Sequence, residues 1–237
     1  MSAVDSRSFW RDPDIRGVLS ACITLGFAVG VVGVTFGVSA IAAGASTLQA
    51  SAMSLLVFTG ASQFSSVSVF ASGGTALAAF GGAAVLAARN AVYGLAMAPH
   101  LKGRLSTRLV AAQLTIDEST AMAAAQDDEA HRRAAFWVTG ASIYVFWNIG
   151  TVAGALIGQT VNLKAFGLDA AFPAAFIAMI WPLLRQRRAR QAAIVGAGVC
   201  LVLIPFAPIG VPILCASLGV LAGVPAEAPQ VAEVGAA

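Results

Sequence analysis

No charged side chain occurs between Gly17 and Ala88, and the next charge, Arg89, still lies inside an apolar run. A membrane-spanning helix needs roughly 20 predominantly apolar residues, so this interval alone has room for about three passes. Soluble domains do not leave such a length without Asp, Glu, Lys or Arg. The sequence therefore predicts a membrane protein whose function depends on the few polar groups inside its apolar segments.

The rest of the chain has the same character. Of its residues, 58% are hydrophobic and 11% are charged, and the mean hydropathy is +0.83. Further uncharged stretches are 134–163, 170–184 and 191–226. We expect an all-α polytopic membrane protein with about seven transmembrane helices, within a range of about six to eight, some of them broken.

We expect one transmembrane domain over 17–224, between a polar N-terminal segment, 1–16, and a disordered tail, 225–237. The first segment interleaves arginine with aspartate, unlike a cleaved signal peptide, and should be retained. The tail is rich in Ala, Pro and Glu and has little to bury.

The basic residues gather in short loops, so the net charge of +3 indicates membrane orientation rather than nucleic-acid binding. The strongest cytoplasmic marker is the cluster Arg185, Arg187, Arg188 and Arg190. Segment 170–184 should then exit inward and 134–158 should run outward. This places Arg132 and Arg133 in the cytoplasm as well, in agreement with the same rule.

A cytoplasmic N-terminus requires an even number of crossings before Arg132, but three apolar runs precede it. Segment 105–125 crosses or half-crosses, or 49–72 is broken and partly re-entrant, or the N-terminus lies outside. We favour the first alternative, which puts Lys102, Arg104 and Arg108 outside.

Small residues and prolines shape the other apolar runs. Gly26, Gly30, Gly33 and Gly37 follow the small-x3-small pattern of close helix packing. Prolines divide the last run into two short helices, about 191–204 and 211–223. Portions 17–98 and 134–223 each hold about three elements, which suggests a two-fold internal repeat.

The first polar cluster within the membrane surrounds Gln63. Gly60 and Ser62 precede it among small and hydroxyl residues. A buried amide offers both donors and acceptors, so Gln63 suits a zwitterionic ligand or an unwound backbone. We select Gly60, Ser62 and Gln63 as substrate-binding candidates, with helix packing as the alternative.

One helical turn carries Arg89, Asn90 and Tyr93, which combine a guanidinium, an amide and a phenol. Arg89 either reaches the headgroups at the interface or faces the bundle interior with a partner. The acids available nearby are Asp117 and Glu118, and we expect one of them to pair with Arg89.

Asp117 and Glu118 lie in a segment with few other charges. Carboxylates there suit coupling to protons or recognition of an ammonium group, and a solvated amphipathic helix is the alternative. Asn148 lies among aromatic residues and is a further substrate-binding candidate.

The chain offers little for an enzyme. His100 and His131 are its two histidines, and it contains no G-x-S-x-G, H-E-x-x-H or P-loop pattern. We expect neither catalytic residues nor a metal site nor a cofactor.

The order of these motifs resembles the AzlC family of branched-chain amino acid permeases, which includes the YgaZ valine exporters. The motifs are Phe58-x-Gly60-Ala61-Ser62-Gln63-Phe64, Ala88-Arg89-Asn90-x2-Tyr93-Gly94, Ala98-Pro99-His100-Leu101 and Asp117-Glu118-Ser119. The resemblance extends from about residue 10 to residue 223. It implies a bacterial inner-membrane secondary transporter that exports branched-chain amino acids together with a small AzlD-type membrane subunit.

The residues fit such a substrate. Arg89 or the backbone donors of 60–63 suit the carboxylate of an amino acid, and Asp117 or Glu118 suit its ammonium group. We favour proton coupling through either acid. The alternatives are a channel or facilitator for another small solute and a membrane scaffold subunit without transport.

Overall fold

The computed structural model describes residues 13–160, 177, 181, 183–207 and 211–223, which form helices and connecting loops without a strand. The all-α prediction is confirmed. The chain divides into two compact units, 1–175 and 176–237. The predicted tail, most of the predicted helix at 170–184 and residues 1–12 of the N-terminal segment lie outside the described residues.

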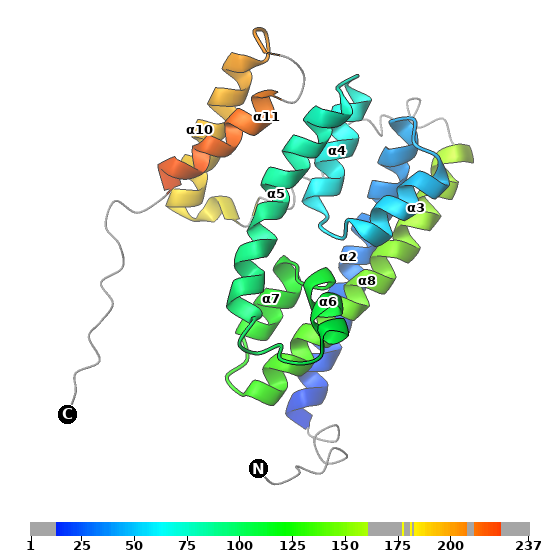
Figure 1. Ribbon diagram of the computed structural model, residues 1–237, viewed down its shortest axis with the longest axis vertical. Coiled ribbons are helices and arrows are strands. Elements are labelled where there is room, and N and C mark those ends of the chain that lie inside the picture. The colour runs from blue at the N-terminus through cyan, green and yellow to red at the C-terminus, as the bar shows by residue number, and fades with distance from the viewer. Residues whose placement is uncertain (1–12, 161–176, 178–180, 182, 208–210, 224–237) are drawn as a thin grey trace, which may run out of the picture. The chain divides into compact units, whose positions relative to one another are not determined.

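Within the first unit, three long helices alternate with two pairs of short helices (Figure 1). The long helices are α2 (Pro13–Ala42), α5 (Ala76–Met97) and α8 (Glu129–Thr160). The short helices are α3 (Thr47–Leu56), α4 (Ala61–Ala71), α6 (Leu105–Gln113) and α7 (Asp117–Ala124). In the described part of the chain, three helices, α2, α5 and α8, are long and apolar enough to cross a membrane. The expected count of about seven is not confirmed.

Helices α2 and α8 run parallel and pack along their glycines. A Cβ atom at Gly33 would lie 2.7 Å from the carbonyl oxygen of Trp147, and one at Gly37 would collide with the carbonyl of Thr151. Gly154 on α8 faces the α2 backbone in the same way. Small residues let the two backbones approach closely, which is how helices gain contact area in a membrane. The predicted packing role of the α2 glycines is confirmed.

Helices α3 and α4 form a re-entrant hairpin, which we call hairpin 1 (47–71). The α3 helix runs antiparallel to α8. At the start of α3, Gln159 near the end of α8 donates a 2.6 Å hydrogen bond to the hydroxyl of Thr47, and two turns later along α3 the Ser54 and Thr151 hydroxyls lie 3.1 Å apart. After the turn, α4 returns to the end of the bundle where α3 began (Figure 1).

Helices α6 and α7 form the second re-entrant element, hairpin 2 (105–124), which enters from the opposite end (Figure 1). The α6 helix ends at Gln113, whose Nε2 donates a 3.0 Å hydrogen bond to the Leu55 carbonyl of hairpin 1. The α7 helix runs back toward the start of α8, where Arg132 donates a 2.6 Å hydrogen bond to the carbonyl of Gln126. The tips of the two hairpins therefore meet at an exposed contact partway along the bundle.

This arrangement bears on the count of crossings. Two of the candidate spans, α2 and α5, precede Arg132, and the parallel packing of α2 on α8 puts the start of α2 and Arg132 at the same end. The segment 49–72 is broken into two short helices, as one alternative proposed, and 105–125 is broken as well, so a full crossing by one helix is not seen there. His100, just after α5, lies 2.7 Å from Glu129 at the start of α8. The expectation that Lys102, Arg104 and Arg108 face the side opposite Arg132 is therefore wrong, because hairpin 2 leaves the bundle where it enters.

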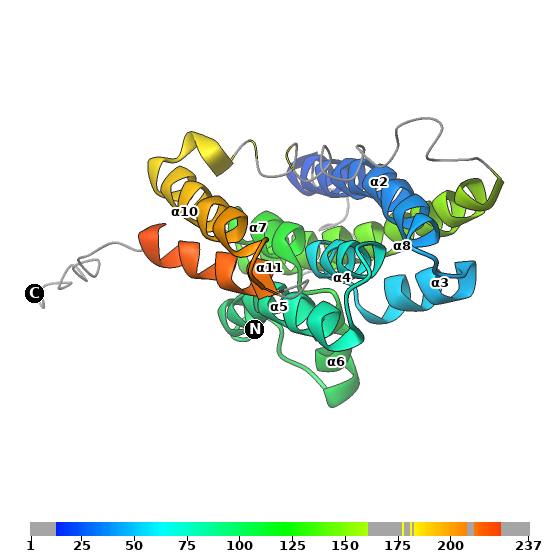
Figure 2. The ribbon, with the colours of Figure 1, turned by 90° about the horizontal axis from the view of Figure 1, so that it is seen from above.

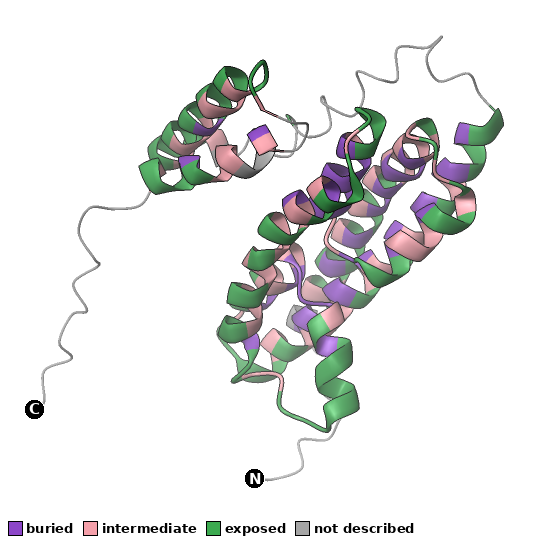
Figure 3. Ribbon diagram, turned by 45° about the horizontal axis from the view of Figure 1, so that its top comes forward, coloured by how far each residue is buried: buried purple, intermediate pink, exposed green. Residues whose placement is uncertain are grey.

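Helices α4 and α7 both pack against α5, and on their other sides α4 packs against α2 and α7 against α8 (Figure 2). Buried residues gather where α2, α4 and α8 meet (Figure 3). The ring of Phe36 stacks on Trp147 at 6.1 Å and meets Phe64 edge to face at 5.5 Å. This aromatic cluster holds hairpin 1 against the α2 and α8 pair.

The second unit contains η2 (Leu183–Arg185), α10 (Arg187–Leu203), α11 (Val211–Ala216) and η3 (Ser217–Gly223). Gly196 and Gly219 form the close contact between α10 and η3. The two short helices predicted around the prolines are present, although α10 begins at Arg187 rather than near 191. The segment at 208–210, between them, lies outside the described residues.

Candidate functional site

An ion pair joins α5 to hairpin 2 in the first unit. The Nη1 atom of Arg89 lies 2.8 Å from Oδ2 of Asp117, and the two side chains are 37% and 38% exposed. Asp117 is the first residue of α7, where a carboxylate is favoured by the helix dipole. The pairing expected from the sequence is therefore present.

The pair leaves hydrogen-bonding capacity unused on both sides. The Nε of Arg89 and the Oδ1 of Asp117 are inaccessible to solvent and have no hydrogen-bond partner in the structure. Leaving a buried donor and a buried acceptor unpaired is costly, by about 1–3 kcal/mol each. The ion pair therefore leaves the Nε of Arg89 and the Oδ1 of Asp117 for a ligand, with the Tyr93 phenol beside the same carboxylate.

Three further candidates surround the ion pair. Tyr93, one turn beyond Arg89 on α5, interacts electrostatically with Asp117. Glu118 is next to Asp117 and interacts with both charges of the pair. Asn90 follows Arg89 and is half-buried. The α5 and α7 helices thus bring five of the proposed site residues into one neighbourhood.

The amide of Gln63 is engaged within hairpin 1. Its Oε1 accepts a 3.2 Å hydrogen bond from the Gly60 backbone N–H, and its Nε2 donates a 3.1 Å bond to the carbonyl of Met53. Gly60 has a φ of +52°, a backbone region that favours glycine. These contacts make Gln63 and Gly60 determinants of the hairpin turn.

The turn of hairpin 2 is also held by a side chain that binds the backbone before the returning helix. The Ser119 hydroxyl accepts a 3.1 Å hydrogen bond from the Ile116 backbone N–H and lies 2.7 Å from the carbonyl of Leu114. Gln63 and Ser119 each occupy the third position of the returning helix and bind the residue that precedes that helix. The two turns are therefore built alike, although their sequences differ.

The first turn of α4 approaches the same region of α5. Ser66 on α4 donates a 3.4 Å hydrogen bond to the carbonyl of Ala79 on α5, and a Cβ at Gly82 would lie 3.1 Å from the Ser65 hydroxyl. These antiparallel contacts place the start of α4 beside the turn of α5 that precedes Arg89. The N-terminal ends of α4 and α7 are thus directed toward one another from opposite halves of the bundle (Figure 1).

Asn148, another candidate, donates a 2.7 Å hydrogen bond to the Tyr144 carbonyl on its own helix. Its role in binding stays a prediction. The sequence did not single out Thr59, Gln113 or Trp147 as candidates. The hydroxyl of Thr59 and the indole N–H of Trp147 are buried without a partner. A lone threonine or tryptophan in an apolar run carries no signal that would have identified it.

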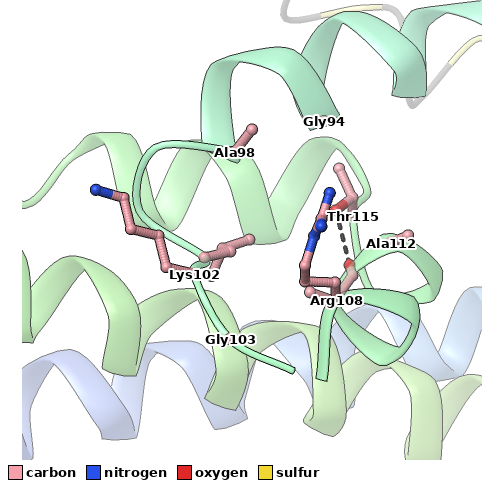
Figure 4. A pocket seen from close by; sticks show the side chains of 9 residues that line it. Gly94, Ala98, Lys102, Gly103, Arg108, Ala112 and Thr115 are labelled. Atoms are coloured by element: carbon pink, nitrogen blue, oxygen red, sulfur yellow. Dashed lines mark hydrogen bonds between the residues drawn. The ribbon is translucent and has the colours of Figure 1, made fainter. Parts of the chain in front are cut away.

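Each hairpin has a pocket beside it. One of about 390 Å³ lies between the end of α5, the following loop and hairpin 2 (Figure 4). Lys102 and Arg108 line it, and the guanidinium of Arg108 extends toward Thr115. A second pocket, of about 380 Å³, lies between hairpin 1 and the end of α2 and has the mostly apolar lining Ala40, Ala43, Gly44, Ala45, Gln49, Ala50, Met53, Val67 and Phe70.

The chain was also compared with known proteins. A family model described as AzlC protein matches residues 24–161, which is more than half of the chain. No curated protein and no solved structure matches it. The matched segment contains hairpin 1, α5 and hairpin 2.

Proposed function

The chain belongs to the AzlC family, a family of membrane transporters, and we propose that it exports valine, leucine and isoleucine across the bacterial inner membrane. In this proposal it is a proton-coupled secondary transporter rather than an enzyme, and it works with a small AzlD-type membrane subunit.

The unsatisfied ion pair is the observation that carries the proposal. An amino acid brings one carboxylate, which accepts hydrogen bonds, and one ammonium group, which donates them. The free Oδ1 of Asp117 suits the ammonium, and the free Nε of Arg89 together with the first-turn N–H groups of α4 suits the carboxylate. A solute without both an anionic and a cationic group would leave the Nε of Arg89 or the Oδ1 of Asp117 without a charged partner.

The two hairpins support transport by alternating access. Transporters commonly bind substrate near the membrane midplane between broken helices, and rocking of one half against the other exposes the site to each side in turn. Here the hairpins enter from opposite ends, and a pocket lies beside each one. Opening either hairpin would connect the ion pair to one side of the membrane.

The distribution of basic residues supports export. Lys102 and Arg108, in the pocket beside hairpin 2, lie at the same end as Arg132 and Arg133. The positive-inside rule makes this end cytoplasmic. Basic side chains at this entrance can donate hydrogen bonds to the carboxylate of an arriving amino acid.

Asp117 and Glu118 are the proposed coupling residues. Protonation of Asp117 would remove the charge that holds Arg89, which frees hairpin 2 from α5. Substrate and proton then compete for the same carboxylate, and this competition couples the transport of the substrate to that of the proton.

The proposal is tested by efflux of preloaded labelled valine and leucine from cells that express the chain, with and without the small subunit. Asp117→Asn should reduce efflux at least about tenfold because the ammonium loses its charged partner. Asp127→Asn, in the exposed loop after α7, is the matched control and should transport normally.

Collapse of the proton gradient with a protonophore distinguishes the alternatives. A proton-coupled exporter should lose concentrative efflux, whereas a channel or facilitator should still equilibrate its solute. If expressed protein gives no efflux above background with the subunit present, branched-chain amino acid export is refuted and a wider solute screen is the next step.

A further inference from the structure

Three unpaired hydrogen-bonding groups belong to residues at the start of α4 or to the aromatic ring packed beside it. They are the hydroxyls of Thr59 and Ser62 and the indole N–H of Trp147, all inaccessible to solvent and without a partner in the structure. Ser62 is 1% exposed and Trp147 is 4% exposed. Buried polar side chains are nearly always paired, so three such groups around one helix terminus call for an explanation.

The indole of Trp147 is fixed beside this terminus. Its Cη2 atom lies 3.9 Å from the position that a Cβ at Gly60 would occupy. Phe36 stacks on the ring, and Phe64 meets it edge to face at 6.1 Å. Because Gly60 immediately precedes α4, the aromatic contacts hold the Trp147 ring at the first turn of that helix.

The groups at this position can all donate hydrogen bonds. An indole N–H can only donate, and a hydroxyl can donate to an anion. The first-turn N–H groups of an α-helix have no acceptor within the helix, and the helix dipole adds partial positive charge there. Gln63 already occupies the N–H of Gly60, which leaves those of Ala61 and Ser62 available. Such a set of donors is complementary to a carboxylate.

We propose that the carboxylate of the substrate binds at the N-terminus of α4 and is held by Thr59, Ser62 and Trp147. This inference rests on the proposed function, and it divides the zwitterion between the two hairpins: hairpin 1 takes the carboxylate and Asp117 of hairpin 2 takes the ammonium. The donors are closed to solvent in this conformation, so substrate enters when hairpin 1 moves away from α8.

The test measures binding to the full-length chain in lipid nanodiscs by calorimetry, with its small subunit where folding requires it. The three probes are valine, valinol, which replaces the carboxylate with an alcohol, and isovalerate, which lacks the ammonium. The variants are Thr59→Val, which is nearly isosteric, and Trp147→Phe, which keeps a smaller aromatic ring, and each removes one donor. Trp137→Phe, on the same helix as Trp147, is the matched control.

Each of the two variants should weaken valine and isovalerate by about five- to tenfold, as expected for one hydrogen bond to a charged group, and should leave valinol within about twofold of wild type. Unchanged valinol affinity also shows that the variant is folded. Unchanged valine affinity, or an equal loss for valine and valinol, overturns the carboxylate site.

Failure of the proposed function gives a different result. In that case wild type binds no branched-chain amino acid and yet binds isovalerate with an affinity that the two variants reduce. That result supports the carboxylate site and refutes amino acid export. If wild type binds none of the three probes, both proposals are refuted.

Discussion

Gln113 on hairpin 2 donates a 3.0 Å hydrogen bond to the backbone carbonyl of Leu55 on hairpin 1. The same carbonyl accepts a 3.2 Å hydrogen bond from the hydroxyl of Tyr144 on α8. The end of α3 therefore uses a free C-terminal carbonyl to join the two re-entrant elements to a spanning helix. A movement of either hairpin that opens the bundle must change this junction.

Gln113→Leu removes the donor at nearly constant volume, and we expect it to slow transport by about fivefold while substrate affinity stays within about twofold. The expected change falls on the rate because the junction lies outside the proposed binding groups. Initial efflux rates and binding measured on the same preparations check this. Gln126→Leu is the matched control, since the amide of Gln126, just after α7, donates to the carbonyl of Met122 in that helix. An equal loss of rate in both variants would show that Gln113 has no specific role in transport.

The sequence was sufficient for the helical class, for the packing glycines of α2 and for the Arg89 and Asp117 pair. Each depends on a local signal: an uncharged run, a four-residue spacing, or a charge that must find a partner in an apolar environment. The family resemblance rested on the order of the same motifs.

The hairpins were harder to foresee, because a half-length apolar helix and half of a spanning helix have the same composition. The two cases differ in the turn between the helices. The turns at Gly60 and Ile116 depend on packing against α8 and α5, which are distant in sequence, as well as on the side chains of Gln63 and Ser119. The unit of long helix, hairpin and long helix occurs twice and shares α5. The predicted repeat of 17–98 with 134–223 includes residues outside those that the structure describes and stays a prediction.

The ion pair predicts a charge-reversal rescue. Arg89→Asp and Asp117→Arg should each reduce transport to near background, because each leaves two like charges facing one another at close range. The double variant restores an opposite pair and should recover measurable efflux, although the altered reach of the side chains keeps it below wild type. A double variant as inactive as either single variant, at equal expression, would show that the two residues act independently.

The close approach of α2 and α8 predicts a steric effect on stability. Gly37→Val should destabilise the protein by about 1–3 kcal/mol, since its Cβ would collide with the carbonyl of Thr151 and force the helices apart. Thermal unfolding in detergent, followed by loss of the monodisperse peak, measures the change. Gly17→Ala, on the same helix, has no atom within 4 Å of the new Cβ and should unfold at or slightly above the wild-type temperature, because alanine is the better helix former.

The re-entrant path of hairpin 2 makes a prediction about sidedness that separates it from a full crossing. Single cysteines at Ala45, Lys102 and Ala130 in a background without native cysteines report the side of each loop through a membrane-impermeant maleimide applied to intact cells. Two crossings before α8 put positions 102 and 130 on the same side, so both should resist labelling until the cells are permeabilised, and position 45 should be labelled at once. A helix pair that crossed at 105–125 would put positions 102 and 130 on opposite sides. Opposite labelling of these two positions would therefore contradict the re-entrant path of hairpin 2. It would also contradict the meeting of the two hairpin tips on which the proposed mechanism depends.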